Sequence, residues 1–178
     1  MNIFYLSETP TECAKFHVDK HTVKMILEYA QLLCTTHRVV DGVETQSVSP
    51  SGRKQKIWVL KDKEMDDLLY KATHINHPSA VWVRYSVENY RWLYNLFIAL
   101  QKEYTFRYGK VHACSKLNSA LENCPTKLPF RGFTQPTPAM PADYIKENSI
   151  ESYRAYYKGS KSNMFSWKNR ETPSWITT

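Results

Sequence analysis

The sequence contains little glycine and none of the common nucleotide-binding or hydrolase motifs. Only 5 of its 178 residues are glycine. No GxGxxG, GxxxxGK[ST], GxSxG or HExxH pattern and no EF-hand loop occurs along the chain. These absences count against a dinucleotide-binding fold, a P-loop, a serine hydrolase and a zincin, because each of those sites takes its geometry from its motif. The sequence therefore indicates no familiar cofactor.

The chain also lacks a long hydrophobic run and a close pair of cysteines. Its apolar stretches fall far short of the roughly 20 residues that cross a bilayer, and its N-terminus has no charged segment followed by an apolar run. We therefore expect no membrane partner and a cytoplasmic protein. The cysteines, which form no CxxC pair, are Cys13, Cys34, Cys114 and Cys124. Cys13 and Cys34 would lie about 30 Å apart on one helix, so reduced cysteines are expected.

Positive charge and aromatic side chains are abundant. The formal net charge is +7 and the pI is about 9.2, which favours DNA or a nucleotide as partner, although a membrane surface also attracts positive charge. Aromatic residues make up 13% of the chain. Such rings most often pack in a core, and stacking on bases is the alternative.

Length and hydrophobic spacing predict one compact, mainly α-helical domain over residues 1–178, with a long central helix and a proline-rich wrap. Residues 2–6 read as a short strand or an extended lead-in, and residues 41–56 as an exposed loop. The wrap covers residues 125–141, which hold five of the nine prolines. Helices are predicted over residues of about 9–39, 61–72, 78–108, 110–124 and 149–158.

The stretch HVDKHTVKMILE, residues 17–28, supplies the candidate catalytic residues. At about 100° per residue, one narrow face of a continuous helix would carry His17, His21, Lys24 and Glu28. Asp19 would point the other way unless the helix bends near Val18. In a cleft, the lysine could neutralise a phosphate, the glutamate act as base or electrostatic stabiliser, and a histidine transfer a proton. The alternative is a polar surface with an ordinary four-spaced ion pair.

Two histidines four residues apart also raise the possibility of a divalent metal site. His17 and His21 would need further ligands, and the segment THINHP offers His74 and His77. The HxxxH pattern lacks the intervening glutamate of a zincin. A site without metal or other cofactor is therefore favoured.

A second charged face is predicted on the long helix, where RYSVENYRWLY combines arginines with aromatic rings. The candidate substrate-binding residues there are Arg84, Asn89, Arg91 and Trp92, and RYGKVH adds Arg107 and Lys110 around a glycine break. A surface ion-pair ladder with Glu88 is the alternative. The basic stretch Arg53–Lys63 is either a solvated loop or a rim that contacts phosphate. His37 is predicted to be a helix-end cation.

The segments MNIFYL, HVDKHTVKMILEYAQLL, NHPSAVWVRYSVENYRWLYNLFIALQKEYTFRYGK and AMPADY resemble those of small proteins encoded by tailed bacteriophages. That resemblance implies the cytoplasm of an infected bacterium. The order of elements and the aromatic segment SYRAYY resemble the phage pyrimidine-dimer DNA glycosylases. This second resemblance implies a helical fold with a basic DNA-binding face, excision of a damaged base and strand cleavage through a Schiff base.

The match to these glycosylases departs at the catalytic amine. Those enzymes use the amine exposed when the initiator methionine is removed, whereas Asn2 is a poor neighbour for that removal, so Met1 is expected to stay. Glu28 resembles the family's carboxylate. Lys24 is a substitute amine if burial or neighbouring cations lower its pKa.

The leading hypothesis is an enzyme that acts on DNA or a nucleotide and cleaves a glycosidic bond. Its catalytic residues would be His17, His21, Lys24 and Glu28. The rivals are a metal-dependent phosphohydrolase or nuclease that uses the histidines and Asp19, and a binder without catalysis. The oligomeric state stays open.

Overall fold

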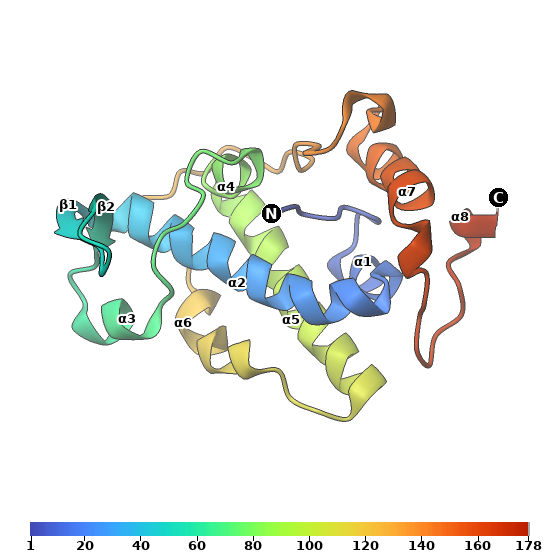
Figure 1. Cartoon of the computed structure of the whole chain (residues 1–178), viewed down its shortest axis with the longest axis horizontal. Coiled ribbons are helices and arrows are strands. Elements are labelled where there is room, and N and C mark those ends of the chain that lie inside the picture. Colours follow the sequence, from blue (N-terminus) through green and yellow to red (C-terminus); the bar gives the residue numbers. More distant parts are fainter. Residues whose placement is uncertain (178) are drawn as a thin grey trace.

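The structure is a computed structural model that describes residues 1–177. Helices dominate these residues, and a two-stranded hairpin is their only sheet (Figure 1). The prediction of a mainly α-helical fold is confirmed. Two long helices, α2 (Asp19–Asp41) and α5 (Val87–Tyr108), cross at the centre of the molecule (Figure 1). Within the described range, no helix combines the length and the apolar character needed to span a bilayer.

The core forms where the apolar sides of α2 and α5 meet. Met25, Tyr29 and Leu33 follow one another at four-residue steps along α2 and are at most 1% exposed, as expected for one face of a helix. The extended segment Ile3–Leu6 lies in the same core. Helix α1 (Pro10–Phe16) packs against α5.

The predicted continuous helix over residues 9–39 is wrong, because the chain breaks between α1 and α2. His17 and Val18 have extended backbone angles, with ψ values of 131° and 157°. The buried guanidinium of Arg107 fills this break. Its two Nη atoms donate to the carbonyl oxygens of His17 and Lys15, each at 2.9 Å. A helix cannot satisfy these carbonyls at its end, so the arginine replaces the missing turn.

A second break divides the predicted helix over residues 78–108 into α4 (Pro78–Val83) and α5. Ser86 lies between them and caps α5, because its hydroxyl accepts from the backbone N–H of Asn89. The same hydroxyl donates to the carbonyl of Gly132 at 2.9 Å. Helix α5 ends at Gly109, whose φ of 64° favours glycine.

Residues 125–141 contain neither helix nor strand and are held by side chains of α2 and α5. Asn89 exchanges two hydrogen bonds of 2.9 Å with Thr134, through its Nδ2 and its Oδ1. Glu88 accepts from the backbone of Gly132 at 3.1 Å, and Asp41 accepts from that of Thr126 at 2.6 Å. These bonds fix the proline-rich segment across the helices.

Residues 41–56 are mostly exposed, as predicted, but the prediction of a loop is wrong. Strands β1 (Val43–Val48) and β2 (Lys54–Val59) form an antiparallel hairpin there. The backbone N–H of Gly52 bonds the carbonyl of Ser49 at 2.8 Å, and Gly52 has φ 79°. A proline-containing turn followed by a left-handed glycine is a common three-residue hairpin connection.

The remaining elements are short, apart from the helix near the C-terminus. Helix α7 (Ser149–Ser160) closely matches the predicted helix over 149–158. The predicted helix over 61–72 is only six residues long, and the one over 110–124 consists of a 3₁₀ turn followed by a five-residue helix. The short elements are α3 (Lys63–Leu68), η1 (Ala113–Leu117), α6 (Asn118–Glu122), η2 (Ala142–Tyr144), η3 (Ser162–Met164) and α8 (Ser174–Thr177). All four cysteines are free.

Candidate functional site

A small polar pocket of about 140 Å³ gathers three of the four candidate catalytic residues. Its lining comes from the N-terminal segment, from α2 and from residues around the end of α7. Its lining residues are Met1, Asn2, Phe4, His21, Lys24, Met25, Glu28, Tyr156 and Lys161. Segments at both ends of the chain therefore complete the polar face of α2.

The carboxylate of Glu28 lies among amino groups in this pocket. Its Oε1 is 3.0 Å from Lys24 Nζ, and its Oε2 is 4.0 Å from the α-amino nitrogen of Met1. The side chains of Glu28 and Met1 are 15% and 5% exposed, whereas that of Lys24 is 70% exposed. Lys24 thus lacks the burial that the substitute-amine hypothesis requires.

The pocket has an excess of positive charge over the single carboxylate. Lys161 joins Lys24 and the α-amino group of Met1 in its lining, and Lys161 Nζ lies 4.8 Å from the centroid of the Tyr156 ring. Asn2 Oδ1 is buried and has no hydrogen-bond partner in the described part of the chain. A buried polar atom without a partner is costly. The pocket therefore suits an anionic ligand that also donates a hydrogen bond.

His21 is held as a neutral side chain at the pocket wall. Its ring stacks on Phe4 with 4.3 Å between centroids, and its Nδ1 lies 2.6 Å from the hydroxyl of Tyr157. Burial, followed by the charges of neighbouring histidine and lysine side chains, lowers the pKa of His21 to about 3. The backbone of Val18 also bonds the Tyr157 hydroxyl. The Tyr157 oxygen accepts that bond from the backbone, so its hydroxyl can donate its proton to His21 Nδ1. A neutral histidine whose Nδ1 accepts carries its own proton on Nε2.

His17 lies in the core and does not line the pocket. It is 0% exposed, because the break after α1 turns it away from the face of α2. Its Nδ1 donates to the carbonyl of Cys13 at 2.7 Å, and its Nε2 accepts from the hydroxyl of Tyr29 at 2.8 Å. Both ring nitrogens are occupied, so His17 supports the packing behind the pocket. The predicted single face with His21, Lys24 and Glu28 is corrected accordingly.

The loop that carries His74 and His77 lies near the pocket. Burial is the main cause that lowers the pKa of His77, and the α-amino group of Met1 and His74 lower it further, while Glu28 opposes them. His77 Nδ1 accepts from the backbone N–H of Ser79 at 3.1 Å. Over residues 1–177, no group of three or more His, Cys, Asp or Glu side chains is placed to hold a metal ion.

Asp19, the other ligand considered for a metal, serves the fold. Its carboxylate accepts from Arg107 at 2.9 Å, from the Ser166 hydroxyl at 2.6 Å and from the backbone N–H of Lys168 at 3.0 Å. These bonds join the start of α2 to the C-terminal segment.

None of the predicted substrate-binding residues lines the pocket. Three of them are buried in the fold: Asn89, Trp92 and Arg107 are 0%, 9% and 1% exposed. Their predicted role in substrate binding is therefore corrected to a role in packing. Trp92 donates to the carbonyl of Glu8 at 2.8 Å. Arg84 is half-buried and donates to the carbonyl of Ile75 at 2.7 Å, which holds the histidine loop. Arg91 and Lys110 are exposed elsewhere on the surface.

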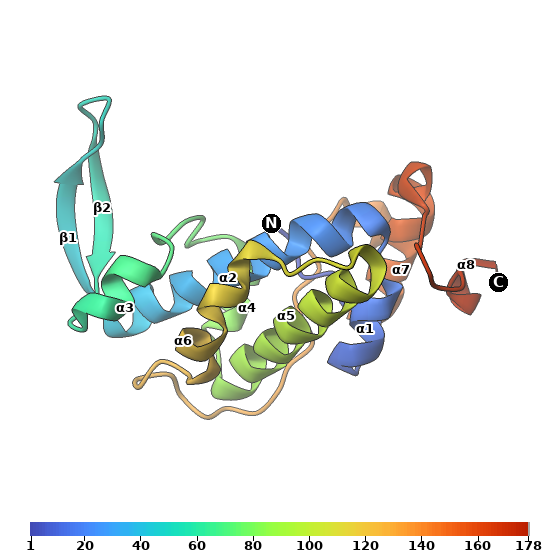
Figure 2. The same ribbon diagram turned by 90° about the horizontal axis from the view of Figure 1, so that it is seen from below.

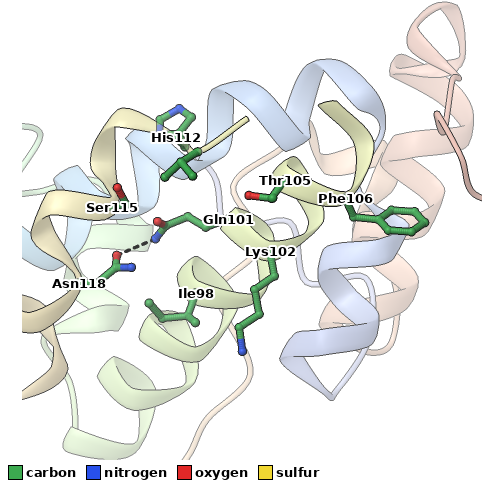
Figure 3. Close-up of a pocket in the computed structure, with 9 residues that line it drawn as sticks. Ile98, Gln101, Lys102, Thr105, Phe106, His112, Ser115 and Asn118 are labelled. Carbon is green, nitrogen blue, oxygen red and sulfur yellow. Dashed lines mark hydrogen bonds between the residues drawn. The ribbon is translucent and has the colours of Figure 1, made fainter. Parts of the chain in front are cut away.

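A larger groove of about 500 Å³ lies along α5 beside η1 (Figure 3). Its only charged side chain is that of Lys102, and Gln101 donates to Asn118 at 2.8 Å across it. His112 lies at its edge and accepts from the backbone N–H of Cys114 at 3.2 Å. The groove lacks a carboxylate beside an amine, so we place the candidate chemistry in the smaller pocket.

Sequence reasoning missed the contributions of Tyr156, Tyr157 and Lys161. These residues lie more than 130 positions from His21 in the sequence, and no local spacing relates the two segments. The segment SYRAYYKGSK combines three tyrosines with basic residues along α7 and the residue after it. That composition does not identify the surface that the helix meets.

Three buried histidines should make folding sensitive to mild acid. Burial lowers the pKa values of His17, His21 and His37 from 6.5 to about 4, 3 and 4. The prediction of a helix-end cation is thus wrong for His37, which bonds Tyr90 at 2.8 Å. The unfolded chain takes up these protons first, so stability is lost as pH falls from about 6.5 towards 4.

We expect the free energy of unfolding in urea to fall by roughly 1–2 kcal/mol per buried histidine between pH 7 and pH 5. His37→Gln should reduce this pH dependence, and His74→Gln, at an exposed position, should leave it unchanged. Equal urea midpoints at the two pH values would contradict the burial of neutral histidines.

Comparison of the chain with protein-family models, curated proteins and solved structures gave no match in any of the three.

Proposed function

We propose that the pocket around Glu28 binds the sugar of one nucleotide unit, in DNA or in a free nucleotide, and that the protein cleaves its glycosidic bond. The observation that carries this proposal is the Glu28 carboxylate, 15% exposed and 3.0 Å and 4.0 Å from two amino groups. The order of elements, which resembles that of the phage pyrimidine-dimer DNA glycosylases, points the same way. In this arrangement the carboxylate can stabilise positive charge on the sugar, and an amino group beside it can act as the nucleophile.

The reaction requires charge stabilisation at the sugar. As a base leaves, its sugar becomes oxocarbenium-like and positively charged. The Glu28 carboxylate stabilises that charge in a partly dehydrated pocket, where electrostatic interactions are stronger than in water. Lys24 and Lys161, both in the lining, hold the neighbouring phosphates. His21 presents its Nε2–H as a fixed donor to a sugar or base oxygen.

An unprotonated amine of the pocket is the proposed nucleophile. It adds to C1′ of the sugar while the C1′–N bond to the base breaks, and the base leaves with the bonding electron pair. The proton that the amine loses balances the one that the base gains. The imine formed after ring opening is a Schiff base. The pocket amines that can serve as nucleophile are the α-amino group of Met1 and Lys161, because Lys24 is 70% exposed.

The size of the pocket restricts how DNA is presented. A volume of about 140 Å³ accommodates one ring and not a whole nucleotide. Within a duplex, the target unit must therefore leave the base stack, as it does in other enzymes that act on bases. The ring of Tyr156 in the lining offers a stacking surface.

The proposal is tested by incubating the purified protein with damaged, modified and ordinary DNA and with free nucleotides, followed by mass spectrometry of the products. We expect a free base and an abasic or cleaved strand from one of these substrates. Tight binding without any product would instead support the non-catalytic binder. Release of phosphate that stops when a chelator is added would replace the proposal with a metal-dependent phosphohydrolase. If the protein neither bound nor converted any of these substrates, the proposal would be refuted.

A further inference from the structure

The hairpin of β1 and β2 projects from the helical body as a separate ribbon (Figure 2). Its six residue pairs give it a length of about 20 Å. Most of its residues are exposed, and the two strands pair only with each other within the described residues. An isolated two-stranded hairpin is marginally stable in water. This ribbon therefore needs support at its base.

The base of the ribbon is rigidly anchored by Arg38. This side chain is 0% exposed and donates to the carbonyl of Trp58 in β2 at 2.8 Å. It also donates to the backbone of Tyr70 and Leu69 at 2.6 and 2.7 Å, and it forms an ion pair with Asp66. The network fixes the direction in which the ribbon leaves α2.

The outer half of the ribbon is basic. Arg53, Lys54 and Lys56 are exposed, and Glu44 is the only acidic residue on the two strands. Glu44 lies nearer the base, 2.7 Å from Lys56 Nζ. The two glutamines Gln46 and Gln55 are also exposed. The ribbon thus combines phosphate-binding cations with side chains that can both donate and accept hydrogen bonds.

We infer that this ribbon enters the major groove of duplex DNA. The groove is wide enough for a two-stranded ribbon, and an amide side chain such as that of Gln46 reads base edges there; Gln55 lies on the opposite face, because it pairs with Ser47. Arg53, Lys54 and Lys56 would contact the phosphates on either side. The same charges disfavour a protein strand as occupant, because lysines on exposed strands oppose the addition of another strand.

The position of the ribbon relative to the pocket fits a single duplex. Glu28 lies 14 residues before Gly42, which corresponds to about 21 Å along the helix axis and about six base pairs of DNA. The hairpin and the N-terminus lie on the same side of α2 (Figure 2). Resting on the proposed function, this inference selects duplex DNA over a free nucleotide as its substrate.

The test measures the binding of a fluorescently labelled 20-base-pair duplex by anisotropy over a range of salt concentrations. The full chain is compared with an R53A/K54A/K56A variant and with a control of equal charge, K102A/K116A/K146A, which removes exposed lysines from other parts of the surface. We expect the ribbon variant to lose affinity on the order of 10²-fold at 0.1 M salt. Its log–log salt slope should be smaller by about 2.7, as three lost phosphate contacts predict.

Three results would overturn the inference. The first is normal duplex binding by the ribbon variant, and the second is equal loss in the ribbon variant and the control. The third is a single strand that binds as tightly as the duplex and loses as much affinity in the variant. Circular dichroism would verify that the variants fold. If no substrate yields a base but the ribbon variant alone loses duplex binding, the proposed function fails and the ribbon inference holds. If bases are released and the ribbon variant binds the duplex normally, the proposed function holds and the ribbon inference fails.

Discussion

Replacing Glu28 with glutamine should lower the rate of base release at saturating substrate by about 10²–10³-fold. Glutamine keeps the shape of the side chain but removes the negative charge that stabilises the sugar in the transition state. Ground-state binding should change little or become tighter, because an anionic ligand loses a nearby carboxylate. The measurement is a single-turnover assay of base release, accompanied by a binding titration.

The control for this prediction is Glu64→Gln. Glu64 is an exposed glutamate in the first turn of α3, and its substitution removes the same charge away from the pocket. We expect wild-type rates. If Glu28→Gln retained full activity, or lost only affinity, the carboxylate would have no role in the chemical step and the pocket would be a binding site.

Replacing Arg107 with methionine should destabilise the protein by about 3–5 kcal/mol, which is the usual cost of breaking a buried charge network. Arg107 bonds Glu103 at 2.7 Å and Asp19 at 2.9 Å, in addition to the carbonyls of Lys15 and His17. The Glu103 side chain is 4% exposed. Without Arg107, it keeps only Arg170, and the break before α2 loses its partners.

Thermal and urea unfolding would measure this effect. A loss of that size lowers the melting temperature of a chain of this length by on the order of 10 °C. Arg91→Met is the matched control, since Arg91 lies on the same helix and is exposed, and it should shift the melting temperature by only a degree or two. A melting temperature for Arg107→Met near that of the control would show that the network contributes little.

The carboxylates of this network should make the free energy of unfolding depend on pH below about 4. Salt bridges and hydrogen bonds, opposed by burial, leave the pKa values of Asp19 and Glu103 below their ordinary values. Their contribution to stability is present above the unfolded pKa of a carboxyl group, near 4, and is lost as pH falls further. Loss of stability between pH 6.5 and 4 therefore reports the histidines, and below pH 4 the carboxylates add to the remaining contribution of His21.

The mainly α-helical class could be predicted because it depends on the spacing of apolar residues within each segment of the chain. Apolar residues at three- and four-residue steps identify α2 and α5, and Gly109 marks the end of α5. The two helix breaks could not be predicted in this way. Each depends on a distant partner, such as Arg107 at the turn after His17, which lies 90 residues away in the sequence.

The hairpin was missed because its strands are polar. Val43–Val48 and Lys54–Val59 alternate weakly, and most of their residues are exposed, so neither segment shows the one-sided hydrophobic pattern of a strand on a core. The turn at Ser49–Gly52 was visible as SPSG. Since the Arg38 network holds the base of the ribbon, the strands do not need a buried face of their own.

The candidate site was predictable only in part. The spacing of His21, Lys24 and Glu28 placed these residues on one face of α2, and they line one pocket. His17 would share that face only on a continuous helix, which the break after α1 interrupts. Lys161 and Tyr156 complete the pocket from the end of α7, a tertiary contact that local spacing does not specify.

The central claim is that the sugar of a nucleotide unit lies beside Glu28 and the amino groups around it. The most direct measurement is reduction with borohydride of a complex between the protein and an oligonucleotide that contains an abasic site, followed by peptide mapping of the covalent adduct. We predict an adduct on a partly enclosed amine of the pocket, namely Met1 or Lys161. Adducts spread over the hairpin lysines and other surface lysines, with none on these two, would contradict the claim.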